Sequence, residues 1–320
     1  MLLLAGGCAS GAGIEPSPPA PTTAAEPTTT TTPSTTTTAT VPETTTSTPP
    51  PTTSTTGVSA ATPCERLRGP VRAGEVSDPS LPEISGVAAS RTHPGVLWVV
   101  NDSGNAPTIH ALALDGTLVA SIPVDGENID WEDLALGPGP GGDHLYVADI
   151  GDNRFRRESV TILRLREPDP LDPPGIAVPD RLEVTYPDGP ADAEAVVVEP
   201  DGDVLMISKV VLGEGTVYRV PASAWAEGAV RATAVGTVDI GLLGLVTAAD
   251  ASVDGTLVAV RTYTDVFLFS GSDPVDALVS GDRCAAPTPS ERQGEAITVL
   301  GDGFVTIGEG IGEPVWRVDR

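Results

Sequence analysis

Asp130-Trp-Glu-Asp-Leu-Ala-Leu-Gly137 is a short apolar run that opens with carboxylates. A Gly/Pro-rich turn follows, and then a second apolar run, His144-Leu-Tyr-Val-Ala-Asp-Ile-Gly-Asp-Asn153, which closes with more carboxylates. Two strand-like runs joined by a glycine turn are typical of a β-hairpin. The same pattern recurs along the chain, so this hairpin is one copy of a repeated unit.

Five copies of the unit are present, and they begin at Ser85, Glu132, Glu194, Thr247 and Glu295. A period of about 50 residues with variable insertions is typical of a propeller or solenoid. Runs of Val, Ile, Leu and Thr between Asp-Gly and Gly-Pro turns favour strands, and a repeat of this length can hold four of them. We therefore predict an all-β protein, a five-bladed β-propeller with four antiparallel strands in each blade.

The last repeat ends at Arg320 without a fourth strand of its own. We expect Pro70–Val76 to supply that strand and close the ring, because a closed ring leaves no exposed sheet edge. Six blades is the alternative, if the Pro-rich insertion Glu167–Pro179 or the segment Gly236–Gly244 contains extra strands.

The composition divides the chain into three parts. Residues 1–14 look like a truncated lipoprotein-type signal in which Cys8 would carry the lipid. Residues 15–63 are nearly all Thr, Pro, Ser and Ala, which offers too little apolar surface for a core and predicts a disordered stalk. Residues 64–320 then form the propeller. These features predict an exported protein that is lipid-anchored on the cell membrane or displayed at the cell surface.

The charge of the chain limits its partners. Its 44 acidic and 18 basic residues give a net charge of −26 at pH 7. Nucleic acid is excluded as a partner, because phosphate binding needs a basic surface. We expect a monomer that contacts the membrane through its lipid anchor. Its remaining possible partners are a protein, a glycan or a small anionic ligand. The three histidines have no zinc-ligand spacing, and no Gly-x-Ser-x-Gly motif marks a serine hydrolase.

The cysteines agree with export. With Cys8 assigned to the anchor, Cys64 at the start of the propeller and Cys284 before the last repeat remain. Because the two ends of a propeller meet, we predict that these two form a disulfide that clasps the ring. A loop of this length corresponds to about 4 to 5 kcal/mol in the chain-entropy model.

Polar residues recur at one end of the predicted hairpins. The first and second strands of each unit are antiparallel, so the start of one and the end of the other lie at the same end of the blade. Ser85, Glu132, Glu194, Thr247 and Glu295 stand at the starts of first strands, and Asn101, Asp102, Asp149, Lys209, Arg261 and Glu309 at the ends of second strands. One mouth of the central channel should therefore collect these side chains.

Two interpretations of this mouth are open. Carboxylate oxygens suit Ca²⁺, for which the candidate ligands are Asp102, Glu132, Asp149, Glu194, Glu295 and Glu309. Basic side chains can orient an anionic group of a substrate, so the candidate catalytic residues are Glu132, Glu194, Glu295, Lys209 and Arg261. In the other interpretation, the same side chains are ion pairs and hydrogen bonds that tie neighbouring blades together.

Several motifs together resemble those of a group of exported bacterial β-propeller (lipo)proteins. They are Asn101-Asp-Ser-Gly104, Asp130-Trp-Glu-Asp-Leu-Ala135, Tyr146-Val-Ala-Asp-Ile-Gly-Asp-Asn153, Glu194-Ala-Val196, Arg261-Thr-Tyr263 and Gln293-Gly-Glu-Ala-Ile297. The Glu-Ala-Ile opening is more distantly similar to phytase-like and esterase-like propellers. That resemblance implies calcium-dependent ester hydrolysis at a carboxylate-lined mouth with basic residues for phosphate, and this chain has only Lys209 and Arg261 at those positions.

These observations predict a cell-surface, lipid-anchored binding or interaction module whose channel mouth can hold Ca²⁺. The alternative is a Ca²⁺-assisted hydrolase of phosphate or carboxylic esters, of the phytase-like kind.

Overall fold

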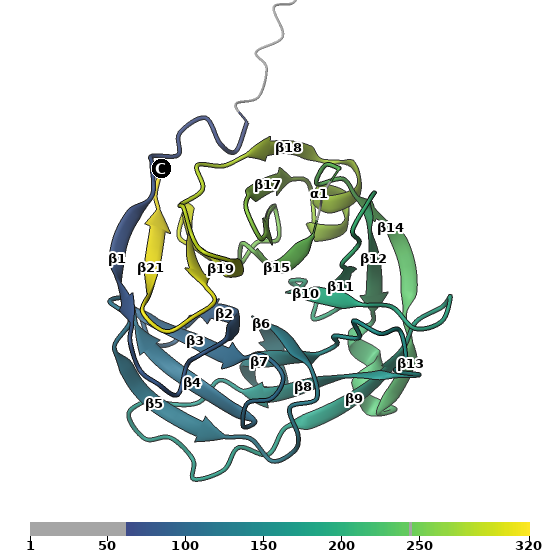
Figure 1. Cartoon of the computed structure of the whole chain (residues 1–320). Coiled ribbons are helices and arrows are strands. Elements are labelled where there is room, and N and C mark those ends of the chain that lie inside the picture. The colour runs from purple at the N-terminus through teal and green to yellow at the C-terminus, as the bar shows by residue number, and fades with distance from the viewer. Residues whose placement is uncertain (1–61, 243–244) are drawn as a thin grey trace, which may run out of the picture. The chain divides into compact units, whose positions relative to one another are not determined.

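The computed structural model describes residues 62–242 and 245–320, which form a five-bladed β-propeller (Figure 1). The predicted signal with Cys8, and the stalk up to residue 61, lie outside the described residues. No helix in the described part of the chain is long and apolar enough to cross a bilayer.

Each blade is one antiparallel sheet. The first blade contains β2 (Ile84–Ala89), β3 (Val96–Asn101), β4 (Thr108–Ala113) and β5 (Leu118–Pro123). The second contains β6 (Trp131–Gly139), β7 (Gly142–Asp149), β8 (Val160–Arg166) and β9 (Asp180–Thr185). The third contains β10 (Ala193–Val198), β11 (Val204–Ser208), β12 (Gly215–Val220) and β14 (Thr233–Val238). The fourth contains β15 (Val246–Ala251), β16 (Leu257–Thr262), β17 (Val266–Ser270) and β18 (Asp282–Ala285). The fifth contains β19 (Gly294–Leu300), β20 (Gly303–Gly308), β21 (Glu313–Val318) and β1 (Val71–Val76).

The ring is closed by its N-terminal strand, as predicted. β1 pairs antiparallel with β21, so strands from the two ends of the propeller lie side by side in one blade (Figure 1). The predicted disulfide is also confirmed. Cys64, which precedes β1, is bonded to Cys284 in β18, so the N-terminal segment is attached to the outer strand of the fourth blade as well as to the fifth.

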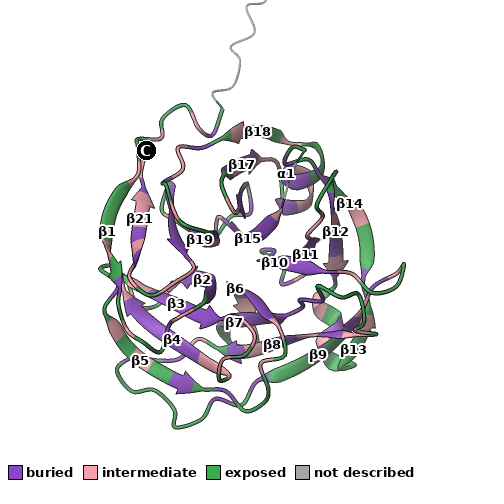
Figure 2. Cartoon of the chain, viewed as in Figure 1, coloured by how far each residue is buried: buried purple, intermediate pink, exposed green. Residues whose placement is uncertain are grey.

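Burial follows the position of a strand within its blade (Figure 2). Innermost strands such as β10 and β15 are buried along their whole length, whereas outer strands such as β5 and β14 are largely exposed. The apolar core is divided into five clusters, one between each pair of neighbouring blades. The blades are therefore held together by apolar packing of sheet on sheet.

Some features of the fold were not predicted. One is a short helix α1 (Pro274–Ser280), which precedes β18. The other is strand β13 (Ala229–Arg231), which follows a 3₁₀ turn η1 (Ala222–Ala226). β13 pairs in parallel with β9 and gives the second blade a fifth strand at its edge. The six-bladed alternative is wrong, because the Pro-rich insertion contributes only one parallel bridge, between Val124 and Ala177, and the described part of Gly236–Gly244 contains only the end of β14.

Candidate functional site at the channel mouth

A β-bulge occurs near the start of every innermost strand. The register shifts between Ile84 and Gly86 in the first blade, and the equivalent shift occurs in each of the other four. The residues left unpaired by these shifts are the five that begin the sequence repeats, Ser85, Glu132, Glu194, Thr247 and Glu295. A bulge re-aims the side chain of its extra residue, so the repeat positions are set apart from the regular pleat.

The five bulge residues have two different roles. Ser85 donates a hydrogen bond from Oγ to the carbonyl of Trp131 at 2.8 Å, and Thr247 donates one from Oγ1 to the carbonyl of Gly294 at 3.1 Å. Both bonds reach the start of another blade, so these hydroxyls tie blades together. The three glutamates line a cavity at the channel mouth.

This polar cavity has a volume of about 130 Å³. Of the residues named from the sequence, it brings together Ser85, Asp102, Glu132, Glu194, Lys209, Glu295 and Glu309. The other residues that line it are Glu83, Ile84, Asn153, Tyr263 and Gln293. Lys209 is the only basic residue among them, so the cavity is strongly acidic.

Two candidate residues lie elsewhere. Asp149 is paired with Arg157 at 2.8 Å and accepts hydrogen bonds from the backbone N–H groups of Ile129 and Asp130. Arg261 is fully buried and paired with Glu291, whose other oxygen accepts from Thr306. A Cβ atom at Gly294 would lie 1.8 Å from a guanidinium nitrogen, so glycine there makes room for Arg261. Neither Asp149 nor Arg261 lines the cavity, and both stabilise the surrounding loops.

The polar residues that sequence reasoning missed follow a simple alternation. Glu83, Asp130, Asp192 and Gln293 each stand two residues before a bulge residue. Side chains two residues apart in an extended segment point the same way, so this position could have been read from four of the five repeats. The remaining omissions, Asn153 and Tyr263, lie in loops that follow second strands.

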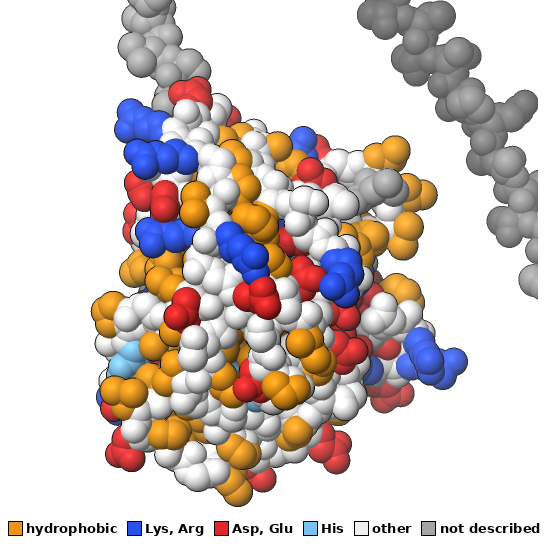
Figure 3. Space-filling model, turned by 60° about the vertical axis from the view of Figure 1, so that its left-hand side comes forward, with side chains coloured by type: hydrophobic (Ala, Val, Ile, Leu, Met, Phe, Trp, Pro, Cys, Tyr) orange, Lys and Arg blue, Asp and Glu red, His pale blue; other side chains and the backbone are white. Residues whose placement is uncertain are grey.

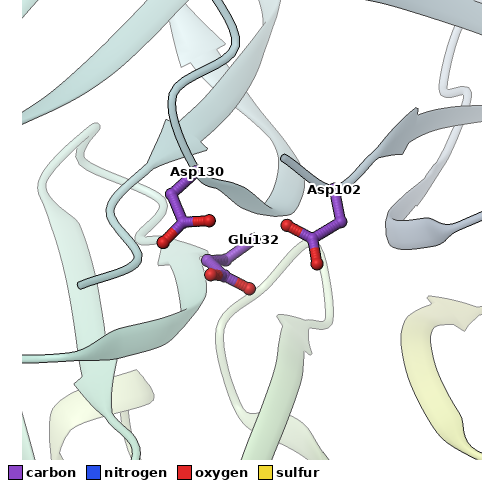
Figure 4. Close-up of side chains that lie close together, drawn as sticks. All are labelled: Asp102, Asp130 and Glu132. Carbon is purple, nitrogen blue, oxygen red and sulfur yellow. The ribbon is translucent and has the colours of Figure 1, made fainter. Parts of the chain in front are cut away.

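Asp102, Asp130 and Glu132 form the tightest group of carboxylates at the mouth. One oxygen from each lies within 4.8 Å of the others, and the three carboxylates point toward one another (Figure 4). Glu132 is only 6 % exposed. Within the described residues, no ion pair involves these three side chains, and the hydrogen-bonding neighbour of the Glu132 carboxyl is another acid, Glu194.

Glu194 and Lys209 form the one ion pair of the cavity among the described residues. The Lys209 Nζ atom lies 2.8 Å from Glu194 Oε1 and 5.0 Å from the centre of the Tyr263 ring. Glu295 and Glu309 share a single neutral donor, the Gln293 side-chain amide. The cavity therefore contains more carboxylates than Lys209 can neutralise.

The pKa values of these acids are shifted upward. Burial, and then the charge of Glu194, raise the pKa of Glu132 well above its usual value. Burial raises the pKa of Glu194 to about 7, although Lys209 opposes the rise. Burial raises the pKa of Glu295 to about 8, against the hydrogen bond from Gln293. Without a bound cation, the folded protein therefore retains protons here that the unfolded chain would release.

This shift predicts an unusual dependence of stability on pH. A carboxyl whose pKa is raised in the folded state stabilises the fold below the unfolded pKa, and this stabilisation is lost as pH rises through the folded value. In chelator, Glu295→Gln should thus match the wild type at pH 4 and exceed its unfolding free energy at pH 8.5 by on the order of 1 kcal/mol or more. Denaturant unfolding at the two pH values measures this difference. If the unfolding free energies of Glu295→Gln and the wild type differ by the same amount at pH 4 and at pH 8.5, Glu295 ionises normally.

Two further buried carboxylates carry out the inter-blade tying that the sequence suggested for the mouth. Asp133 Oδ2 accepts from the backbone N–H of Val196 at 2.9 Å and of Ala249 at 3.1 Å, which joins β6 to β10 and β15. Asp250 Oδ2 accepts from Thr298 Oγ1 at 2.7 Å and from Val299 N at 2.8 Å, which joins β15 to β19. A charged residue inside an otherwise apolar strand was the available sequence signal.

A second acidic group, Glu199, Asp201 and Asp203, lies in the turn between β10 and β11. The guanidinium of Arg219 already occupies it, with Nε 3.0 Å from Glu199 and 2.7 Å from Asp203. One guanidinium thus pairs with all three carboxylates of this group, whereas no described basic side chain pairs with Asp102, Asp130 or Glu132 at the mouth. Figure 3 shows that acidic side chains are also spread over one side of the molecule, among hydrophobic ones.

Comparisons with known proteins support the fold. No family model matches the chain, and no curated protein matches it. Among solved structures, it is similar to the major allergen Mala s 1 of Malassezia sympodialis, with a TM-score of 0.51 and 9 % identity over 79 % of this chain and 96 % of that one. The PQQ-bound aldose sugar dehydrogenase of Streptomyces coelicolor aligns with a TM-score of 0.46 and 10 % identity, over 79 % of this chain and 98 % of that one. At such identities, the likeness to Mala s 1 shows a shared propeller-type fold alone.

Proposed function

We propose that the protein is an exported, lipid-anchored binding module that holds one Ca²⁺ ion at the channel mouth. Asp102, Asp130 and Glu132 are the proposed ligands. The observation that carries the proposal is the Glu132 carboxylate, which is 6 % exposed, faces two other carboxylates, and has no cation or N–H donor among the described residues. A buried carboxylate in this setting needs a cation or a proton.

Calcium fits this donor set better than other common metals. All the side-chain ligands of the group are carboxylate oxygens, which Ca²⁺ prefers. Zinc favours nitrogen and sulfur, and none of the cavity residues is a His or Cys. Magnesium demands near-ideal octahedral geometry and keeps most of its waters, so it is usually held by one or two carboxylates. The disulfide supports an oxidising compartment, which agrees with export.

Calcium should raise the thermal stability of the chelated protein through this site. A ligand at 100 times its dissociation constant stabilises the folded state by about 2.7 kcal/mol. Glu132→Gln removes a ligand charge and relieves repulsion with Glu194, so the variant should be at least as stable without Ca²⁺ and should lose the Ca²⁺-induced rise. Scanning calorimetry with and without millimolar Ca²⁺ measures both effects.

Asp201→Asn, in the acidic group that already has Arg219 as its cation, is the matched control and should keep the full rise. An equal rise in the wild type and in Glu132→Gln would refute the proposed ligand set, and no rise in the wild type would refute the calcium site.

Ca²⁺-assisted ester hydrolysis is a second candidate function, favoured by one observation. Glu194 and Glu295 line the cavity with pKa values raised to about 7 and about 8, and a general base works best near the ambient pH. Lys209 alone would orient an anionic group, because Arg261 lies outside the cavity. Turnover of a phosphate or carboxylic ester that disappears in Glu295→Gln with Ca²⁺ binding intact would favour the hydrolase over the binding module.

A further inference from the structure

An apolar groove lies beside the acidic cavity. It has a volume of about 460 Å³, within the range of pockets that bind small molecules. Its apolar walls come from the loops that follow β7 and β11 and from the segments that precede β10 and β15. The apolar residues that line the groove are Phe155, Pro190, Ala191, Val210, Val211 and Leu245.

The groove is continuous with the cavity, because Asn153 and Lys209 line both. The loop after β7 connects them. Gly151 packs so closely on the carboxylates that a Cβ atom there would lie 2.0 Å from Glu132 Oε1 and 2.5 Å from Asp130 Oδ2. Asp152 then donates its N–H to Asp192 in the groove at 2.8 Å. The carboxylate group and the apolar groove are thus two parts of one surface.

Phe155 lies at the groove with a strained backbone and an exposed side chain. It is the one non-glycine residue with a positive φ among the described residues, at 52°, and it is 60 % exposed. A strained backbone that presents an aromatic ring to solvent brings no benefit to the core. A ligand that contacts the ring would explain why this strained, exposed conformation is present.

The charges of the cavity select the head group of that ligand. Within the described residues, Asp102, Asp130, Glu132, Glu295 and Glu309 have no ion-pair partner. The cavity already shows how it holds an ammonium group, since Lys209 Nζ lies between the Glu194 carboxylate and the Tyr263 ring. A second ammonium group beside Glu132 and Glu295 would likewise have carboxylate neighbours, and an anionic head would be repelled.

We propose that the cavity and the groove together bind an amphipathic organic cation, with its ammonium group beside Glu132 and Glu295 and its alkyl or aryl body in the groove. This ligand class goes beyond calcium binding and shares Glu132 with it. The ammonium ligand and Ca²⁺ therefore compete, and each weakens the binding of the other by the same factor.

A series of simple ions tests the proposal on the full chain at pH 8 in chelator. Methylammonium, butylammonium, hexylammonium and hexanoate are titrated by calorimetry. Burial of one methylene is expected to tighten binding about three- to fourfold, so hexylammonium should bind about tenfold more tightly than butylammonium. Hexanoate should not bind. The proposal would be overturned if hexylammonium did not bind. It would also be overturned if hexylammonium bound no more tightly than butylammonium, or no more tightly than hexanoate.

Variants separate this proposal from the calcium site. Phe155→Ala and Val211→Ala should weaken hexylammonium several-fold and leave methylammonium and Ca²⁺ unchanged. Val178→Ala is the matched control, because Val178 is similarly exposed, at 76 % against 69 % for Val211, and lies in the Pro-rich insertion. Hexylammonium binding that is insensitive to both groove variants would refute the groove, even if Ca²⁺ still bound. If the wild type binds hexylammonium as expected but does not bind Ca²⁺, only the calcium site is refuted.

Discussion

Asp133→Ala is expected to lower the free energy of unfolding by about 3 kcal/mol or more. The carboxylate of Asp133 is fully buried and accepts from three backbone N–H groups, those of Leu134, Val196 and Ala249. Truncation leaves these donors without a partner, and each unsatisfied buried donor costs about 1 to 3 kcal/mol. Because the donors belong to three blades, the loss loosens the centre of the ring.

Urea unfolding of Asp133→Ala and Asp133→Asn measures this effect. Asn keeps one acceptor oxygen and should lie between Ala and the wild type. The control is Asp302→Ala, which removes an exposed carboxylate in the turn between β19 and β20 and should change stability little. A stability of Asp133→Ala within about 0.5 kcal/mol of the wild type, the range of ordinary surface changes, would refute the inter-blade role.

Removal of the disulfide should have the other large effect. The pair Cys64–Cys284 spans 220 residues, and a loop of this order corresponds to about 5 kcal/mol in the chain-entropy model. The double variant Cys64→Ser, Cys284→Ser should still close its ring through β1 and β21, with a much lower unfolding midpoint. Reduced wild type should match the variant, which is the internal control. Identical midpoints of oxidised and reduced wild type would contradict the clasp.

The repeat predicted the architecture well because it has a local physical cause. Each unit starts with a polar residue at the β-bulge of an innermost strand, such as Glu132, and continues with a strand that is buried on both faces. Burial on both faces demands an apolar run, and closing the hairpin demands a turn, so both signals appear in the sequence. Ring closure by β1 followed from the missing strand of the last repeat.

The short elements were missed for the opposite reason. Helix α1 has a clear start, with Pro274 in its first turn and Asp273 accepting from the N–H of Asp276. Its seven residues are too few for a helical period to be recognised. β13 has only three residues, and its parallel pairing with β9 joins segments that are distant in sequence.

The candidate site could be predicted only by its position in the fold. Antiparallel pairing of first and second strands is enough to bring Glu132, Glu194, Lys209 and Glu295 to one mouth. It cannot tell that Arg261 turns instead to Glu291, or that Asp149 turns to Arg157, because those partners lie in loops of irregular backbone. Side-chain pairing of this kind depends on loop geometry that no repeat encodes.

Direct binding of Ca²⁺ to the chelator-treated full chain tests the central claim most plainly. Calorimetric titration at pH 7.5 should show one ion bound per chain, with release of protons, because burial raises the pKa of the ligand Glu132 well above its usual value and its bound proton must leave. Glu132→Gln should abolish the binding. No detectable binding at millimolar Ca²⁺, or unchanged binding in Glu132→Gln, would contradict a calcium site at the channel mouth.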